Sequence, residues 1–165
     1  MAMMKSKENL FEYLRDLKIE THTYDYEPFS AADQTGKIGG GIPGCDCKNL
    51  FLKDNRKLFW LVVAKFTTQI DLKKLAKHLS VGSLSFANEK DLMRFLGVTP
   101  GGVTPFGLIH DVEHVVHVVI EESLFDCEQL TFHPLTNTAL TAISSLDFKR
   151  FLSSRGNKVV TFRTR

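Results

Sequence analysis

The sequence has little of what secreted and membrane proteins contain. Its three cysteines, Cys45, Cys47 and Cys127, are odd in number and have no recurrent spacing, which argues against a disulfide framework. We therefore expect free thiols. The longest apolar run, from Leu58 to Ala64, is far shorter than the roughly 20 residues that span a membrane. No secretory signal is predicted at the N-terminus, because its lysines are not followed by a continuous apolar stretch, so we expect a soluble, cytoplasmic protein.

Several familiar catalytic patterns are absent as well. Cys45-Asp46-Cys47 is not C-x-x-C, and no second cysteine pair completes a zinc site. Three histidines stand within eight residues, but no carboxylate-bearing metal signature surrounds them. The chain has no G-x-S-x-G nucleophile elbow. We expect no metal and no cofactor, and the attacking group of a hydrolysis reaction need not come from the protein.

Charge is nearly balanced over the 165 residues but is unevenly distributed. There are 21 Lys and Arg against 19 Asp and Glu, a formal net charge of +2. Residues 149–165 hold six of the basic residues and no acidic one, and residues 48–77 hold eight against two acidic residues. The simpler interpretation is that each block is part of a solvent-exposed face. If the two blocks met in space, they would form a surface that faces phosphates.

Hydrophobic periodicity predicts a mixed order of helices and strands. We expect helices over 7–17, 71–79, 88–96 and 145–154, and a short one starting at Ser30. Strands are predicted over 19–24, 47–53, 58–64, 115–121, 129–132, 138–143 and 158–162, the second and third forming a hairpin. This order predicts one domain, residues 1–165, of the α+β (mixed α/β) class, with helices around a central sheet.

Two polar residues enter the first strand of the predicted hairpin. Lys48 and Asn49 follow a loop containing glycine, proline and cysteine, and neighbouring residues of a strand point to opposite faces. A lysine beside an apolar strand can bind an anion or a carbonyl oxygen, or act as a nucleophile with a lowered pKa. The alternative is a lysine whose stem lies along the sheet edge while its ammonium group stays in water.

Two further segments can line a binding site. Residues 97–105 are rich in glycine and proline, which lets backbone N–H groups approach a ligand, although a tight connection explains them equally well. This loop lacks the P-loop and dinucleotide-binding patterns, so it does not indicate nucleoside triphosphate chemistry. His133 ends a predicted strand and precedes Pro134, a suitable place for a histidine that contacts a ligand, or simply for a surface histidine.

Together these segments resemble one family. The hairpin sequence GCDCKNLFLKD with LFWLVVA, the loop GVTPGGVTPFGL and the segment LTFHPLTNTA are similar, in order and spacing, to motifs of the YbaK/prolyl-tRNA synthetase-associated domain superfamily. The resemblance covers roughly residues 29–151 and is greatest to the free-standing alanyl-tRNA(Pro) deacylases. It implies a central mixed, partly barrel-like sheet, and hydrolysis of the ester of mischarged Ala-tRNA(Pro) by water with help from the 2′-hydroxyl of the tRNA.

The resemblance also implies roles for individual residues. Lys48 would hold the terminal adenosine phosphate or the aminoacyl carbonyl region, and Asn49 would order the site; these two are the catalytic candidates. Gly101, Gly102 and Val103 would supply backbone contacts to the substrate, and His133 would shape the amino-acid pocket. The pocket would admit a small side chain and exclude the cognate one, as in a double sieve.

The chain departs from the family pattern at two places. Cys45-Asp46-Cys47 stands where small or histidine-containing residues are more common, and Gly102 stands where serine or alanine is common. Both bear on which amino acid is removed, so Cys- or Ser-charged tRNA are alternative substrates. A non-catalytic tRNA- or synthetase-binding module, or an amino-acid sensor, is an alternative of another class. The expected partners are the aminoacyl-tRNA(Pro) acceptor end and prolyl-tRNA synthetase, with no membrane and no DNA.

Overall fold

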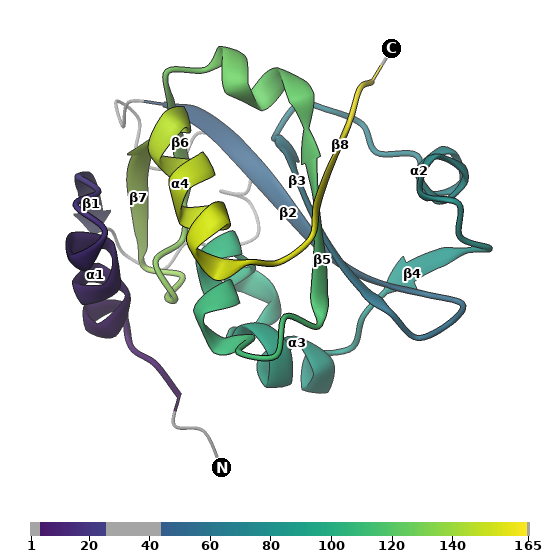
Figure 1. Ribbon diagram of the computed structural model, residues 1–165, viewed down its shortest axis with the longest axis horizontal. Helices are drawn as coiled ribbons and strands as arrows, with labels where there is room; N and C mark the ends of the chain where they lie inside the picture. The colour runs from purple at the N-terminus through teal and green to yellow at the C-terminus, as the bar shows by residue number, and fades with distance from the viewer. Residues whose placement is uncertain (1–3, 26–43, 165) are drawn as a thin grey trace.

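The computed structural model describes residues 4–25 and 44–164 of the chain. The short helix predicted from Ser30 lies outside the described residues. Figure 1 shows the arrangement of the helices, strands and 3-10 helices, which in chain order are α1 (Lys7–Asp16), β1 (Thr21–Asp25), β2 (Cys45–Asp54), β3 (Phe59–Lys65), α2 (Leu72–Leu79), β4 (Leu84–Phe86), α3 (Glu89–Leu96), η2 (Pro100–Gly102), η3 (Pro105–His110), β5 (Val116–Glu121), η4 (Glu122–Asp126), β6 (Gln129–Phe132), β7 (Ala139–Ser144), α4 (Ser145–Arg155) and β8 (Val159–Phe162).

A mixed sheet forms the centre of the molecule. Within the described residues it has eight strands in the order β1-β7-β6-β2-β3-β5-β8, with β4 paired to β2 outside this path. β2 runs antiparallel to β3 and β4 but parallel to β6, and the ladders of β3 with β5 and of β5 with β8 are also parallel. The predicted mixed α/β class, with helices around a central sheet, is confirmed.

The predicted hairpin of β2 and β3 is closed by the carboxylate of Asp54. It accepts hydrogen bonds from the backbone N–H of Arg56 at 2.8 Å and of Leu58 at 3.0 Å, and from the indole N–H of Trp60 at 2.9 Å. Burial raises the pKa of Asp54, but these hydrogen bonds outweigh it and hold the pKa below its ordinary value. The turn that starts β3 is therefore held by an ionised side chain.

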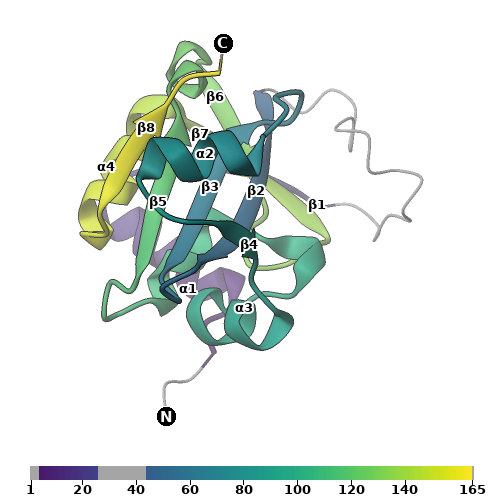
Figure 2. The ribbon, with the colours of Figure 1, turned by 90° about the vertical axis from the view of Figure 1, so that its right-hand side faces the viewer.

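Alternation of side chains along the strands gives each face of the sheet its own core. On one face, α1, α3 and α4 pack their leucines and phenylalanines against Phe51, Leu61 and Val118. On the other face, α2 covers a smaller cluster through Leu75, and Figure 2 shows α2 lying across the strands on the side toward the viewer. β2 contributes to both cores, so its polar residues are divided between the two faces.

Local capping explains where the helices begin. The side chains of Ser6, Asp71, Asn88 and Ser144 accept hydrogen bonds from the first turns of α1, α2, α3 and α4, which satisfies backbone donors that have no partner inside the helix. The predicted helix starts are confirmed. Within residues 4–25 and 44–164, no helix is both long and apolar enough to cross a membrane.

Three features differ from the sequence-based expectation. Cys45 and Cys127 form a disulfide, so the expectation of three free thiols is wrong, and of the three cysteines described only Cys47 is free. The two bonded cysteines stand 82 residues apart and become neighbours only because β2 pairs with β6. The three-residue strand β4 and the short helix η4 were not predicted, and the loop after Gly97 contains η2 and η3.

Candidate functional site

The candidate site lies where β2 passes from one part of the sheet to another. At its start, Cys45 and Asp46 pair with β6, and from Leu52 onward β2 pairs with β4. Between these ladders, residues 47–51 have β3 as their strand neighbour on one edge, and no other described strand pairs with their second edge. Lys48 and Asn49 stand on this open stretch, which is where a ligand can approach the backbone of β2.

Asn49 joins β2 to the glycine-proline loop. Its side-chain Nδ2 donates to the backbone oxygen of Val103 at 3.2 Å. Its Oδ1 is buried and accepts no hydrogen bond from any described residue. Buried polar atoms without a partner are rare in proteins, and an amide oxygen can accept two hydrogen bonds. The Asn49 side chain thus offers an acceptor that a bound hydroxyl or ammonium group can satisfy.

The glycines of the loop lie against the segment that follows His133. A Cβ added at Gly101 would meet Asn137 Nδ2 at 3.8 Å, and one added at Gly102 would meet the Asn137 backbone nitrogen at 3.9 Å. Neither glycine has the positive φ that favours glycine. The fold itself therefore does not require glycine at these two positions. Glycine there is consistent with a site in which another molecule comes close to the backbone.

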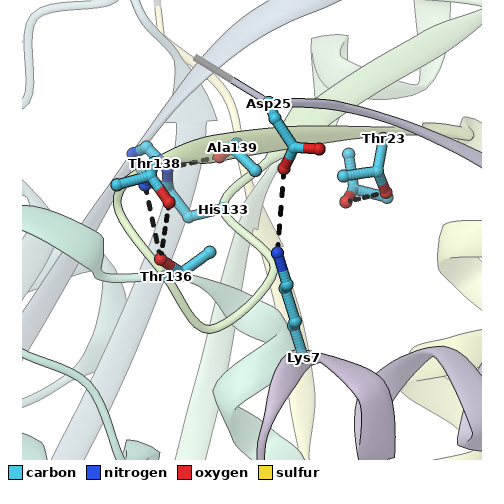
Figure 3. A network of polar contacts seen from close by, with 8 residues as sticks. Lys7, Thr23, Asp25, His133, Thr136, Thr138 and Ala139 are labelled. Carbon is cyan, nitrogen blue, oxygen red and sulfur yellow. Dashed lines mark hydrogen bonds and ion pairs between the residues drawn. The ribbon is translucent and has the colours of Figure 1, made fainter. Parts of the chain in front are cut away.

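His133 is held in a defined orientation directly after β6. Its Nδ1 lies 3.0 Å from the backbone oxygen of Ala139, and Figure 3 shows this bond beside the one between the hydroxyl groups of Thr136 and Thr138. Because a carbonyl oxygen only accepts, Nδ1 carries the hydrogen and Nε2 is the acceptor of the neutral ring. Burial lowers the pKa of His133 below its ordinary value, against the opposing effect of the Ala139 bond, so the ring is neutral at pH 7.

The two catalytic candidates lie on opposite faces of β2. Asn49 points toward Val103, which packs on the larger core, whereas Leu50 on the other side packs on the cluster under α2. Lys48 alternates with Asn49 and is paired with Ala64, a member of that second cluster. The structure brings Asn49 together with the loop at Val103. It places Lys48 on the α2 face instead.

The described side chains around the open stretch offer no ready nucleophile. Cys45 is bonded to Cys127, and burial raises the pKa of Cys47 to about 12, so its thiol stays protonated at neutral pH and reacts poorly. Burial also raises the pKa of Asp46, against the hydrogen bond with Thr131. The arrangement provides hydrogen-bond donors and acceptors on the Asn49 face of β2, and the Lys48 cation on the α2 face.

The structure adds residues that the sequence did not single out. Asn137 and Thr136 lie opposite the glycines, and only the close approach of the two loops reveals them; Thr138 is hydrogen-bonded to Thr136 through their hydroxyl groups. The three closely spaced histidines of the sequence are separated into η3, a turn and β5. Within residues 4–25 and 44–164, no three His, Cys, Asp or Glu side chains lie close enough together to hold a metal ion.

Comparison with known proteins gives consistent relatives. The chain is 32% identical over 155 residues to the prolyl-tRNA editing protein ProX of Acetoanaerobium sticklandii, covering 93% of this chain and 94% of that protein. It is 35% identical over 163 residues to the prolyl-tRNA synthetase associated domain-containing protein 1 of Bos taurus, covering 95% and 94%. A solved structure, proposed as a trans-editing enzyme for prolyl-tRNA synthetase, superposes with a TM-score of 0.69 over 99% of this chain and 100% of that one.

That superposition has 18% sequence identity and shows the shared fold alone. The family itself is shown by a model described as the aminoacyl-tRNA editing domain, which matches residues 37–151 and so covers well over half of the chain. Those residues include the open stretch of β2, the glycine-proline loop and the His133 segment. The resemblance drawn from the sequence motifs is therefore confirmed, as is the enzyme class that it implied, an aminoacyl-tRNA deacylase. The chain belongs to the aminoacyl-tRNA editing domain family.

Proposed function

We propose that this protein hydrolyses the ester of mischarged alanyl-tRNA(Pro), releasing alanine and intact tRNA. The observation that carries the proposal is the Asn49 amide, which joins β2 to the loop at Val103 and keeps a buried acceptor without a partner among the described residues. The relatives named as prolyl-tRNA editing and prolyl-tRNA synthetase associated proteins support proline tRNA as the substrate. No ready nucleophile stands among the described site residues, which favours attack by water.

The reaction needs positioning and charge stabilisation more than covalent chemistry. Water attacks the ester carbonyl carbon, the bond to the ribose 3′-oxygen breaks, and a proton from the water ends on that oxygen. Asn49 Oδ1 accepts a hydrogen bond from the ribose 2′-hydroxyl and so orients it toward the water. The backbone N–H of Gly101 faces the carbonyl oxygen, where a hydrogen-bond donor stabilises the developing negative charge; the N–H of Gly102 donates instead to the Thr99 oxygen at 2.9 Å.

Lys48 and His133 contact different parts of the aminoacyl end of the tRNA, namely a phosphate and the amino acid. Lys48, on the α2 face, binds the phosphate of the terminal adenosine as a point charge. His133, buried and neutral, forms one wall of the amino-acid pocket and limits its size, so that alanine enters and proline does not. Gly102 has no side chain to narrow this pocket, which is why cysteine and serine esters belong in the same assay.

The direct test compares labelled alanyl-, prolyl-, cysteinyl- and seryl-tRNA(Pro) under single-turnover conditions. We expect alanyl-tRNA(Pro) to be hydrolysed fastest and prolyl-tRNA(Pro) to survive. Equal hydrolysis of the alanyl and prolyl esters, or hydrolysis of neither, contradicts the proposal. Faster loss of the cysteinyl or seryl ester would move the specificity to that amino acid. Binding of charged tRNA without cleavage would identify a binding module instead.

A variant pair tests the role of Lys48. Lys48→Ala should weaken tRNA binding and lower kcat/KM, while Lys53→Ala, on the same strand and also half-buried, should change neither by much. Equal effects of the two substitutions would remove Lys48 from the site.

We also propose prolyl-tRNA synthetase as a partner and the cytoplasm as the compartment. Co-purification with the synthetase tests the first proposal, and microscopy of a tagged chain tests the second.

A further inference from the structure

A pocket lies on the α2 face, away from Asn49 and the glycine loop. It has a volume of about 540 Å³ and opens between the start of α2 and the end of β8. In Figure 2, α2 and β8 lie beside each other on the side toward the viewer. Side chains from the β3–α2 connection, from α2 and from the C-terminal segment line it, namely Gln69, Ile70, Asp71, Lys74, Leu75, His78, Phe162, Arg163 and Thr164.

The lining combines an apolar floor with a polar, cationic rim. Leu75 and Phe162 belong to the cluster under α2, and Ile70 packs against it. Gln69 and Asp71 supply amide and carboxylate groups, and Lys74 supplies an ammonium group. A nucleotide has matching parts, namely a flat base with apolar faces and polar edges, and an anionic phosphate.

The carboxylate of Asp71 narrows the choice of base. Its Oδ1 caps α2 by accepting from the backbone N–H of Lys73 and Lys74. Its Oδ2 accepts no hydrogen bond from a described residue. A carboxylate oxygen accepts well from the exocyclic amine of cytosine, while uracil has a carbonyl at that position. The pocket therefore fits cytidine better than uridine.

The lysines of α2 offer positive charge to a ligand at this pocket. Lys73, Lys74 and Lys77 of α2 are exposed, and none of them takes part in an ion pair with another described residue. Arg163 is bound to Glu122 through two hydrogen bonds of 2.9 and 3.0 Å. Lys74 and Arg163 come from the two basic blocks of the sequence, so the fold does bring parts of these blocks together.

The sheet register connects this pocket with Lys48. Lys48 is paired with Ala64 on β3, and the neighbouring row, Val63–Ile120–Thr161, crosses from β3 through β5 to β8 and ends at the residue before Phe162. Three strand spacings of about 4.8 Å separate β2 from β8, a span of about 14 Å. A short single-stranded nucleic acid that binds Lys48 at its end can reach the pocket along this face.

We propose that the pocket between α2 and β8 binds a cytidine nucleotide of the single-stranded 3′ end of tRNA, upstream of the terminal adenosine. The proposal rests on the deacylase function argued above and names a second contact of the same substrate. The base lies on Ile70 and Phe162 with its amine toward Asp71, and Lys74 binds the adjoining phosphate. This contact orients the tRNA end before the ester reaches Asn49.

The experiment combines a matched pair of variants with two substrates. Lys74→Ala removes the ammonium group at the pocket, and Lys73→Ala removes its exposed neighbour, which does not line the pocket. Both are assayed on full-length alanyl-tRNA(Pro) and on 3′-O-alanyl-adenosine, which is too short to reach the pocket. A third substrate carries uridine in place of the penultimate cytidine, and circular dichroism confirms that each variant is folded.

We expect Lys74→Ala to raise KM for alanyl-tRNA(Pro) with kcat little changed, and to leave hydrolysis of alanyl-adenosine unaltered. Loss of one phosphate contact to a single strand should reduce the slope of log K against log salt concentration by about 0.7, and Lys73→Ala should keep the wild-type slope. The uridine substrate should raise KM for the wild type.

Two results overturn the proposal, namely equal effects of the two lysine variants on alanyl-tRNA(Pro), or an unchanged KM with the uridine substrate. If the wild type hydrolyses neither ester, the proposed function itself fails, so the two failures are distinguishable.

Discussion

Cutting the bridge between Cys45 and Cys127 tests how the start of β2 is held in place. Cys45 and Asp46 are the only described residues of β2 that pair with β6, so the disulfide is a large part of the connection between the two strands. Lys48 stands three residues after Cys45, and His133 stands three residues after Leu130, the ladder partner of Cys45. The bridge therefore sits directly before both parts of the candidate site.

The size of the effect follows from the length of chain that the bridge closes. With a sequence separation of 82 residues, the chain-entropy model gives a stabilisation of about 4.5 kcal/mol. For a domain of this length, each kcal/mol shifts the melting temperature by roughly 2–4 °C, so we expect a loss of roughly 9–18 °C on reduction. Activity should fall as well, because the separation between Lys48 and His133 is then held by two ladder pairs and the hydrogen bonds of the Thr131 hydroxyl to Cys45 and Asp46.

The assay is urea unfolding with and without dithiothreitol, on the wild type and on a Cys45→Ser/Cys127→Ser double variant. Thiol titration of the unfolded wild type should find one reactive thiol before reduction and three after it, since Cys47 is free. Cys47→Ser is the control and should keep its response to dithiothreitol, while the double variant should have none. An unchanged unfolding free energy after confirmed reduction of the wild type would refute the reasoning.

Three further predictions concern stability. Asn157→Ala should lose about 1–3 kcal/mol in urea unfolding, because its buried amide donates to Asp111 Oδ2 and to the Val116 oxygen, both at 2.8 Å; a loss below 0.5 kcal/mol contradicts this. Gly107→Ala should lose about 1–3 kcal/mol, since its Cβ would lie 2.6 Å from the Leu96 oxygen, whereas Gly101→Ala, with 3.8 Å to its nearest neighbour, should melt like the wild type. Burial lowers the pKa of His110, His117 and His133. Stability should therefore be constant above about pH 6.5 and fall as protonation favours the unfolded chain at lower pH, with a shallower fall in His133→Asn; identical pH profiles would contradict the assignment.

Much of the local structure could be predicted because its causes are local. Ser6, Asp71 and Asn88 cap their helices through hydrogen bonds within three residues, and Asp54 closes its hairpin in the same way. The three motifs of the family lie in continuous stretches of sequence. Helix starts, the hairpin, the fold class and the family were accordingly accessible without coordinates.

The features that escaped prediction depend on residues far apart in the chain. The bridge of Cys45 needs the parallel pairing of β2 with β6, and Asn137 becomes part of the site only because its loop lies against Gly101 and Gly102. Cysteine number and spacing argued for free thiols, since a single pair separated by 82 residues has no sequence signature.

The sequence by itself determined most of the helices and strands, the mixed α/β class, the family and the residues that its motifs contain, because each depends on short-range patterns. The tertiary structure alone decided that Asn49 faces the loop while Lys48 faces α2, and that Lys74 and Arg163 line one pocket. It also decided that two of the three cysteines are bonded to each other. The physical reason is that strand register and the pairing of distant strands place side chains on faces and edges. Those pairings arise from the packing of the whole chain.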